Sequence, residues 1–162
     1  GDSVLVEIYK NFGVETVFNS DNSIKISKSS NFKPDTINFN LISSPDIAQT
    51  IAVTCFGLGI ECKLTGLHTL KIKETDRLVA LKTEIEKLGG QVTITNDSLE
   101  LAKTDSIKER VSISTYNDHR MAMAFAPLAL KTELVIENAE VVSKSYPAFW
   151  KDLKMIGFKI TQ

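Results

Sequence analysis

Five consecutive polar residues, Lys73-Glu74-Thr75-Asp76-Arg77, stand directly before a run whose apolar residues have helical spacing. On a helix, Lys73 and Arg77 would share one face, and two like charges at that spacing are mildly destabilising unless an anion lies between them. The first turn of a helix also presents free N–H groups and a partial positive charge. The segment therefore predicts a carboxylate or phosphate site; the alternative is a solvated turn in which Glu74 and Asp76 neutralise their neighbours.

A second polar cluster, Tyr116-Asn117-Asp118-His119-Arg120, precedes a segment that is almost wholly apolar. Asp118 could simply cap the helix that begins here, which is a common structural role. His119 and Arg120 then enter the first turn of a buried helix, where an unpaired charge is costly. They need a partner, and either a carboxylate of the protein or one of a ligand would serve.

Two further segments precede helices in the same way. Ser44-Pro45-Asp46 opens an apolar helix, and Asp46 is either a capping residue or, if it faces a cleft and a substrate hydroxyl, a general base. Lys144-Ser145-Tyr146-Pro147 opens an amphipathic helix, with proline at a favourable first-turn position. A single lysine there is normally a surface residue. However, Lys144 follows Lys73 by 71 positions and Asp118 follows Asp46 by 72, so the chain repeats itself in its polar residues too.

The same repeat organises the apolar residues. Three amphipathic segments, each followed by a glycine and then by alternating residues, predict a helix, a left-handed cap and a strand. The predicted helices cover 4–12, 78–88 and 149–156, the glycines are Gly13, Gly89 and Gly157, and the strands that follow begin at 14, 91 and 158. Asn22 and Asn96-Asp97 supply turns that make the first two strands into hairpins, Glu15–Ser27 and Gln91–Leu101.

Helices of a second type alternate with these. The segments 46–58 and 119–130 are apolar nearly all round, which is typical of buried helices. Further strands are predicted near 36–40, 60–65, 111–114 and 134–136. The order αββ-βαβ-αββ-βαβ-α-β predicts an α/β fold with buried inner helices and amphipathic outer ones.

Composition excludes several classes of function. The formal net charge of -1 gives no overall positive field for nucleic acid or an anionic membrane. The longest apolar run, 51–60, is far shorter than the roughly 20 residues of a membrane span. Cys55 and Cys62 match neither a zinc spacing nor a disulfide framework, and His68 and His119 are the only histidines, so no metal site is expected. Two free thiols indicate a reducing compartment, and we expect a cytoplasmic protein.

The polar clusters, in this order, resemble those of the 5-enolpyruvylshikimate-3-phosphate (EPSP) synthase family of enolpyruvyl transferases. The likeness is carried by Pro45-Asp46, by 73–77, by the stretch Asn117-Asp118-His119-Arg120-Met121-Ala122-Met123-Ala124, and by 144–147 before Phe149-Trp150. The stretch beginning at Asn117 is the most specific of these. The resemblance extends over essentially the whole chain.

The resemblance implies an inverted α/β barrel domain with outer sheets. The family has two similar domains, each built from three βαβαββ units, and residues 1–162 resemble most of the second domain. The units would be 1–35 (partial), 36–106 and 107–162. The first domain, which in the family supplies most contacts to shikimate-3-phosphate, would be a missing partner, and we expect the chain alone to be inactive.

The resemblance also implies roles for individual residues. Asp46 resembles the residue that hydrogen-bonds the shikimate hydroxyls and helps to deprotonate the 5-hydroxyl, and Glu74 resembles the carboxyl group that exchanges a proton with the methylene carbon of phosphoenolpyruvate. The cations that would hold phosphoenolpyruvate are Arg77, Arg120 and Lys144. Lys73 resembles a shikimate-3-phosphate contact, as does Thr69, which stands where many members have an amide. Asp118 and His119 would have supporting roles.

The implied reaction transfers the enolpyruvyl group to shikimate-3-phosphate, without metal or organic cofactor. Protonating the methylene carbon needs a carboxylic acid that stays protonated near neutral pH, and several cations must hold the anionic substrate. Two alternatives stay open. One is the related transferase that modifies UDP-N-acetylglucosamine. The other is a non-catalytic anion-binding repeat domain, in which Lys73, Arg77, Arg120 and Lys144 would be dispersed in space.

Overall fold

The computed structural model describes residues 2–29, 34–73 and 75–161. Glu74, predicted as a catalytic residue, lies outside the described residues. The α-helices are α1 (Leu5–Lys10), α2 (Ala48–Leu58), α3 (Arg77–Lys87), α4 (His119–Phe125) and α5 (Phe149–Met155). The 3-10 helices are η1 (Asp2–Val4), η2 (Pro45–Ile47), η3 (His68–Ile72), η4 (Ala126–Leu130) and η5 (Ala139–Lys144).

The strands form three small sheets. The strands are β1 (Val14–Phe18), β2 (Ile24–Lys28), β3 (Thr36–Asn40), β4 (Glu61–Thr65), β5 (Val92–Ile94), β6 (Leu99–Leu101), β7 (Val111–Ile113) and β8 (Leu134–Ile136). β1 and β2 form an antiparallel hairpin, and the central sheet has the order β3-β4-β6-β5 with β3 and β4 parallel. β7 and β8 form a parallel pair. The mixed helix and sheet architecture confirms the predicted α/β class.

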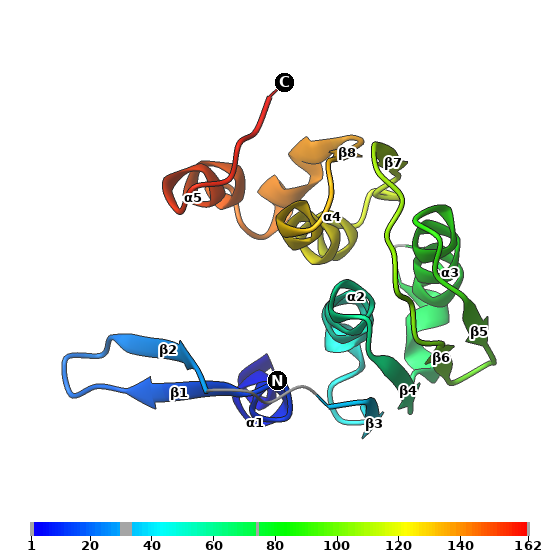
Figure 1. Cartoon of the computed structure of the whole chain (residues 1–162), viewed down its shortest axis with the longest axis horizontal. Coiled ribbons are helices and arrows are strands. Elements are labelled where there is room, and N and C mark those ends of the chain that lie inside the picture. Colours follow the sequence, from blue (N-terminus) through cyan, green and yellow to red (C-terminus); the bar gives the residue numbers. More distant parts are fainter. Residues whose placement is uncertain (1, 30–33, 74, 162) are drawn as a thin grey trace.

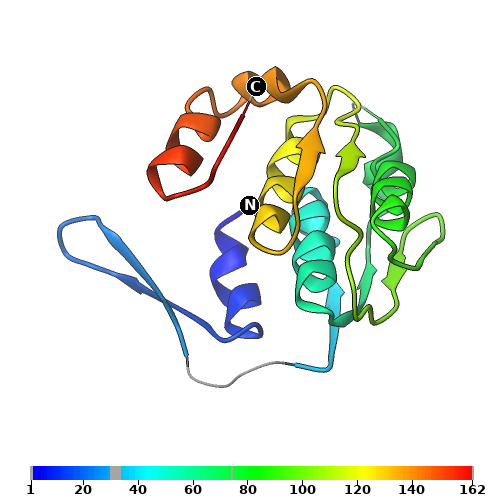
Figure 2. The same cartoon turned by 45° about the horizontal axis from the view of Figure 1, so that its top comes forward.

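The inner helices α2 and α4 lie side by side at the centre, with α3 and the strands outside them (Figures 1 and 2). Seven of the eleven residues of α2 are buried, as its all-round apolar character predicts. α2 also packs tightly against η4, which continues from α4: a Cβ added at Gly57 would meet a side-chain carbon of Leu128 at 2.7 Å. This packing of α2 on α4 forms the core that holds the polar starts of both helices near each other.

The repeat is present in the outer elements as well. Gly13, Gly89 and Gly157 all have positive φ angles (74°, 98° and 106°), which confirms the three left-handed caps. The predicted hairpins are present as β1-β2 and β5-β6. The hairpin β1-β2 projects away from the other elements (Figure 1) and exposes large apolar side chains, among them Phe18, Ile24 and Ile26.

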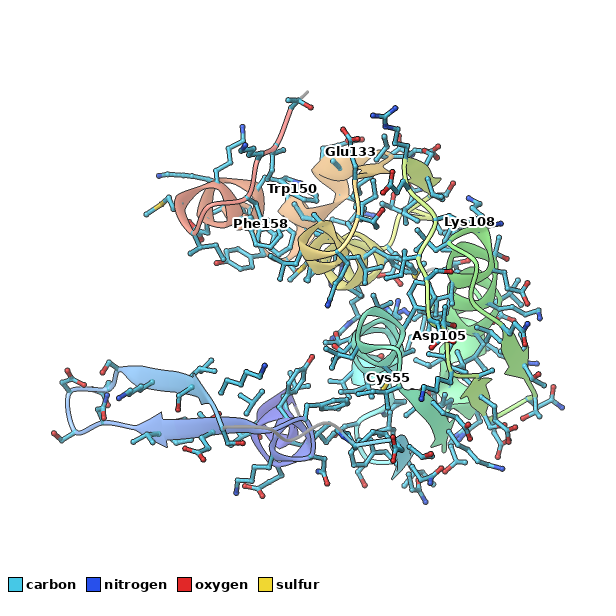
Figure 3. All side chains as sticks on the ribbon, in the orientation of Figure 1. Cys55, Asp105, Lys108, Glu133, Trp150 and Phe158 are labelled. Atoms are coloured by element: carbon cyan, nitrogen blue, oxygen red, sulfur yellow. The ribbon has the colours of Figure 1, made fainter. Side chains whose placement is uncertain are left out.

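Two predicted elements in the second half of the chain differ in the structure. The segment 158–160 is not a strand: among the described residues no strand runs beside it to complete a ladder, and Figure 3 shows Phe158 beside α5 instead. The helix predicted over 119–130 changes to the 3-10 form after Phe125, because Pro127 has no N–H to continue the α-helical hydrogen bonds.

A groove with a volume of about 300 Å³ runs between α1, α2 and α4. Its lining is almost entirely apolar and includes Val53, Leu58, Met123 and Leu128, with Tyr9 at the α1 side. None of these residues belongs to the polar clusters that precede α2, α3 and α4.

Candidate active site

The guanidinium of Arg77 connects two of the predicted site residues. Arg77 begins α3 and its side chain is only 2% exposed. Its Nε donates to Oδ2 of Asp118 over 2.6 Å, and its Nη1 donates to Oδ1 of Asp46 over 2.8 Å. One buried cation thus joins the starts of both inner helices to the start of α3, although the three residues are far apart in the sequence.

Asp118 has the capping role that the sequence allows and a second role as a buried counter-ion. Its Oδ1 accepts the backbone N–H of Arg120 over 2.9 Å, at the N-terminus of α4. Its other oxygen, Oδ2, accepts the hydrogen bond from Nε of Arg77 and a second one, 3.2 Å long, from the side-chain amide of Gln49. The residue is fully buried, and an ionised carboxylate is tolerated there because each oxygen receives hydrogen bonds.

Asp46 lies at the meeting point of three cations. It belongs to the 3-10 turn η2, and its side chain is 36% exposed. Besides Arg77, Nζ of Lys73 lies 3.3 Å from Oδ1, and Nη2 of Arg120 lies 3.9 Å from Oδ2. Arg120 also donates to the backbone carbonyl of Asp46 over 3.0 Å. Burial raises the pKa of Asp46, but the hydrogen bond from Lys73 and the charges of Arg120, Lys73 and Arg77 together hold the pKa below its ordinary value.

This lowered pKa predicts how Asp46 affects stability with pH. A carboxyl group whose pKa is lower in the folded than in the unfolded protein stabilises the fold above the unfolded value, and that stabilisation is lost as pH falls through the folded value. We therefore expect the difference in unfolding free energy between the unaltered protein and Asp46→Asn to be constant at neutral pH and to shrink below about the ordinary value of 3.8. Urea unfolding at pH 7, 5 and 3 measures it; a difference that grows with acidity would contradict the assignment.

The start of α3 differs from its prediction. Asp76, not a ligand, occupies the helix N-terminus: its Oδ1 accepts the N–H groups of Leu78 and Val79 over 3.1 and 3.2 Å. Lys73 has an extended backbone before the helix, so Lys73 and Arg77 do not share a helix face. Both cations nevertheless reach the same oxygen of Asp46.

The remaining predicted residues lie around this cluster. Lys144 ends η5 and donates to the backbone carbonyl of Asn117 over 2.8 Å, one residue before Asp118. His119 is the first residue of α4 and is partly buried. Thr69 lies in η3, and within the described ranges its buried hydroxyl has no hydrogen-bond partner. The roles of Lys144, His119 and Thr69 toward a substrate stay predictions.

Sequence reasoning missed two contributors. Gln49 is fully buried and supports Asp118; its signal is an amide in the first turn of an otherwise mainly apolar helix. Glu84 is also fully buried, at mid-helix in α3, where it accepts from Tyr116. Its helical spacing, three residues after Leu81 and four before Leu88, places it on the apolar face of α3, unlike the exposed Glu86, but its partner is identified only by the fold.

Among the described residues, no group of three or more His, Cys, Asp or Glu side chains is placed to hold a metal ion. Over the same ranges, no helix has the length and apolar character to cross a membrane.

Solved structures place the fold in a class. The structure matches EPSP synthase from Acinetobacter baumannii with a TM-score of 0.78 and 22% identity, covering 98% of this chain and 40% of that one. It matches the enolpyruvyl transferase NikO from Streptomyces tendae with a TM-score of 0.72 and 15% identity, covering 98% of this chain and 36% of that one. The fold is that of the enolpyruvyl transferases.

Sequence comparison then identifies the family. The profile described as EPSP synthase (3-phosphoshikimate 1-carboxyvinyltransferase) matches residues 1–153. The chain is 42% identical to the 3-phosphoshikimate 1-carboxyvinyltransferase of Bacteroides fragilis, over 99% of this chain and 39% of that protein. It is 35% identical to that of Clostridium kluyveri, over 100% of this chain and 37% of that protein. The chain belongs to the EPSP synthase family and spans less than half the length of these relatives.

Proposed function

We propose that the complete protein transfers the enolpyruvyl group of phosphoenolpyruvate to the 5-hydroxyl of shikimate-3-phosphate, giving EPSP and phosphate. The observation that carries the proposal is the convergence of Lys73, Arg77 and Arg120 on the single partly exposed carboxylate of Asp46. Cations fixed in this way suit a substrate with both a carboxylate and a phosphate. In the alternative, a non-catalytic repeat domain, these cations would be dispersed in space, whereas Lys73, Arg77 and Arg120 all contact Asp46.

In the proposed reaction the substrate oxygen adds to C2 of phosphoenolpyruvate while a proton is added to C3. Asp46 accepts the proton of the 5-hydroxyl, since its lowered pKa keeps it ionised at neutral pH. Glu74 supplies the proton to C3 and takes one back when the C2–O bond to phosphate breaks. Arg77, Arg120 and Lys144 hold the carboxylate and phosphate of phosphoenolpyruvate, and Lys73 contacts shikimate-3-phosphate. Thr69, Asp118 and His119 complete the set, Asp118 by fixing Arg77.

We further propose that residues 1–162 are most of one domain and hold about half of the site. The units 36–106 and 107–162 each contribute an inner helix, α2 and α4, whereas the partial unit 1–35 contributes only the outer helix α1 and the hairpin β1-β2. The apolar groove between α1, α2 and α4 is where a third inner helix, from another part of the same protein, would pack. The other domain would close over the cations, and the reaction would take place in the cytoplasm.

The test compares the complete protein with residues 1–162 alone. Phosphate release from phosphoenolpyruvate is measured with shikimate-3-phosphate or with UDP-N-acetylglucosamine as the acceptor. We expect turnover by the complete protein with the shikimate acceptor, none with the nucleotide sugar, and none by residues 1–162 with either. Preference for the nucleotide sugar would identify the other transferase, absence of turnover with both would leave an anion-binding domain, and activity of the isolated chain would overturn the half-site proposal.

A further inference from the structure

A buried carboxylate that is not in contact with Asp46 or its cations holds the loop that leads to Asp118 and Arg120. Glu84 lies seven residues after Arg77 on α3 and is fully buried. One oxygen accepts the hydroxyl of Tyr116 over 2.7 Å, and the other accepts the backbone N–H of Ser114 over 3.2 Å. Nζ of Lys87 lies 2.8 and 2.7 Å from the two oxygens and compensates their charge. Glu84 therefore ties residues 114–116 to the helix that begins with Arg77.

The loop that Glu84 holds has a backbone that needs support. Tyr116 and Asn117 both have positive φ angles, 54° and 56°. Two consecutive residues with side chains rarely occupy the left-handed region, and they persist there only when surrounding contacts enforce it. A further hydrogen bond, from the N–H of Asp118 to the carbonyl of Thr115 over 2.8 Å, closes the turn.

The turn determines where three charged groups lie. Asp118 follows it directly and pairs with Arg77, and the backbone N–H of Arg120 is fixed to Asp118. The carbonyl that accepts Lys144 belongs to Asn117, the second left-handed residue. A change in the turn would consequently move Arg120 and Lys144 relative to Arg77 while leaving Lys73, which contacts Asp46 from the segment before α3, in its place.

We propose that the hydrogen bond from Tyr116 to Glu84 is a positioning device, which fixes the left-handed turn and so sets the spacing of Arg120 and Lys144 from Arg77. The inference rests on the proposed function, in which these three cations bind phosphoenolpyruvate. Tyr116 and Glu84 touch neither substrate and act only through the turn. Burial and the adjacent Glu84 carboxylate raise the pKa of Tyr116 to about 12, so the phenol stays a proton donor throughout the working pH range.

The variant Tyr116→Phe in the complete protein removes only the hydroxyl. We expect KM for phosphoenolpyruvate to rise roughly tenfold, the scale of one lost hydrogen bond to a charged group, while KM for shikimate-3-phosphate stays within about twofold. Glu84→Gln keeps an oxygen for Tyr116 and should give a smaller rise. The matched control is Tyr9→Phe. It removes a hydroxyl that lies outside the turn and forms a 2.8 Å hydrogen bond with Thr54.

The outcomes separate a positioning role from a merely structural one. Equal changes in both KM values, or a Tyr116→Phe variant that behaves like Tyr9→Phe, would overturn the inference while the proposed function stands. If the unaltered complete protein forms no EPSP, the proposed function fails first. Calorimetric titration with phosphoenolpyruvate then decides the inference, since Tyr116→Phe must bind it more weakly than Tyr9→Phe does.

Discussion

Replacing Asp118 by alanine is expected to lower the free energy of unfolding by about 3–5 kcal/mol, the usual cost of removing one partner of a buried ion pair. The Arg77 guanidinium, 2% exposed, would lose its 2.6 Å partner, and the Asp46 carboxylate, whose side chain is 36% exposed, would compensate its charge less well than buried Asp118 does. Helix α4 would also lose its cap, and Gln49 its acceptor. Urea unfolding of the complete protein at pH 7, followed by circular dichroism, measures the change.

Two companion variants separate the contributions to the loss of stability expected for Asp118→Ala. Asp118→Asn keeps the volume and an oxygen for the cap but places an amide NH2 opposite the donors of Arg77 and Gln49, so whatever loss remains belongs to the ion pair and its hydrogen bonds and not to the cap. Glu133→Ala breaks the ion pair with Arg110, 3.0 Å long but 81% and 74% exposed, and should cost no more than about 1 kcal/mol. Figure 3 shows Glu133 on the outside of the molecule, near β8. If Asp118→Ala cost as little as Glu133→Ala, the central place given to the Arg77–Asp118 pair would be wrong.

Most of the local structure could be predicted from the sequence, because helix periodicity, caps and turns depend on neighbouring residues. The left-handed glycines, the buried inner helices and the capping role of Asp118 all follow from short stretches of sequence. Strand formation at 158–160 depends instead on a distant partner strand. The alternating apolar residues of this segment predict a strand, but they carry no information about a partner, and none of the described strands lies beside it.

The site was predictable in its members but not in its arrangement. The repeat and the family resemblance select Asp46, Arg77 and Arg120, but spacing alone assigns Lys73 to the wrong local geometry, on a helix face. The contact of Arg77 with both Asp46 and Asp118 arises from packing among α2, α3 and α4, which no single segment encodes. For the same reason the partners of Gln49 and Glu84, which are distant in sequence, are identified only by the fold.

Fixing the cations before the substrate arrives has a functional consequence. Arg77 is held on two sides and Arg120 on its backbone and side chain, so neither must be ordered when an anion binds. Donors oriented in advance are the main source of electrostatic stabilisation in enzymes. In the proposed reaction the carboxylate of Asp46, 36% exposed, would be open to the hydroxyl of shikimate-3-phosphate.

That position predicts the second large effect: Asp46→Asn in the complete protein should reduce kcat by about 10²- to 10⁴-fold, the range expected for loss of a general base. Asparagine has nearly the same shape, but it cannot accept the proton of the 5-hydroxyl and leaves Lys73 and Arg77 without their shared charge. Steady-state kinetics with both substrates varied gives kcat and each KM. Asp97→Asn, at the exposed turn between β5 and β6, is the matched control and should keep kcat within about twofold.

The companion variant Glu74→Gln separates the two carboxylates. If Glu74 donates the proton to C3, its loss also lowers kcat, and exchange of the methylene protons of phosphoenolpyruvate with solvent stops. Asp46→Asn should leave some of that exchange, because its acid partner is intact. Near-normal turnover in both variants would remove the proposed acid–base mechanism, whereas loss of exchange in both would mean that the two groups act as one coupled pair. Proton exchange is thus the measurement that assigns each carboxylate its step.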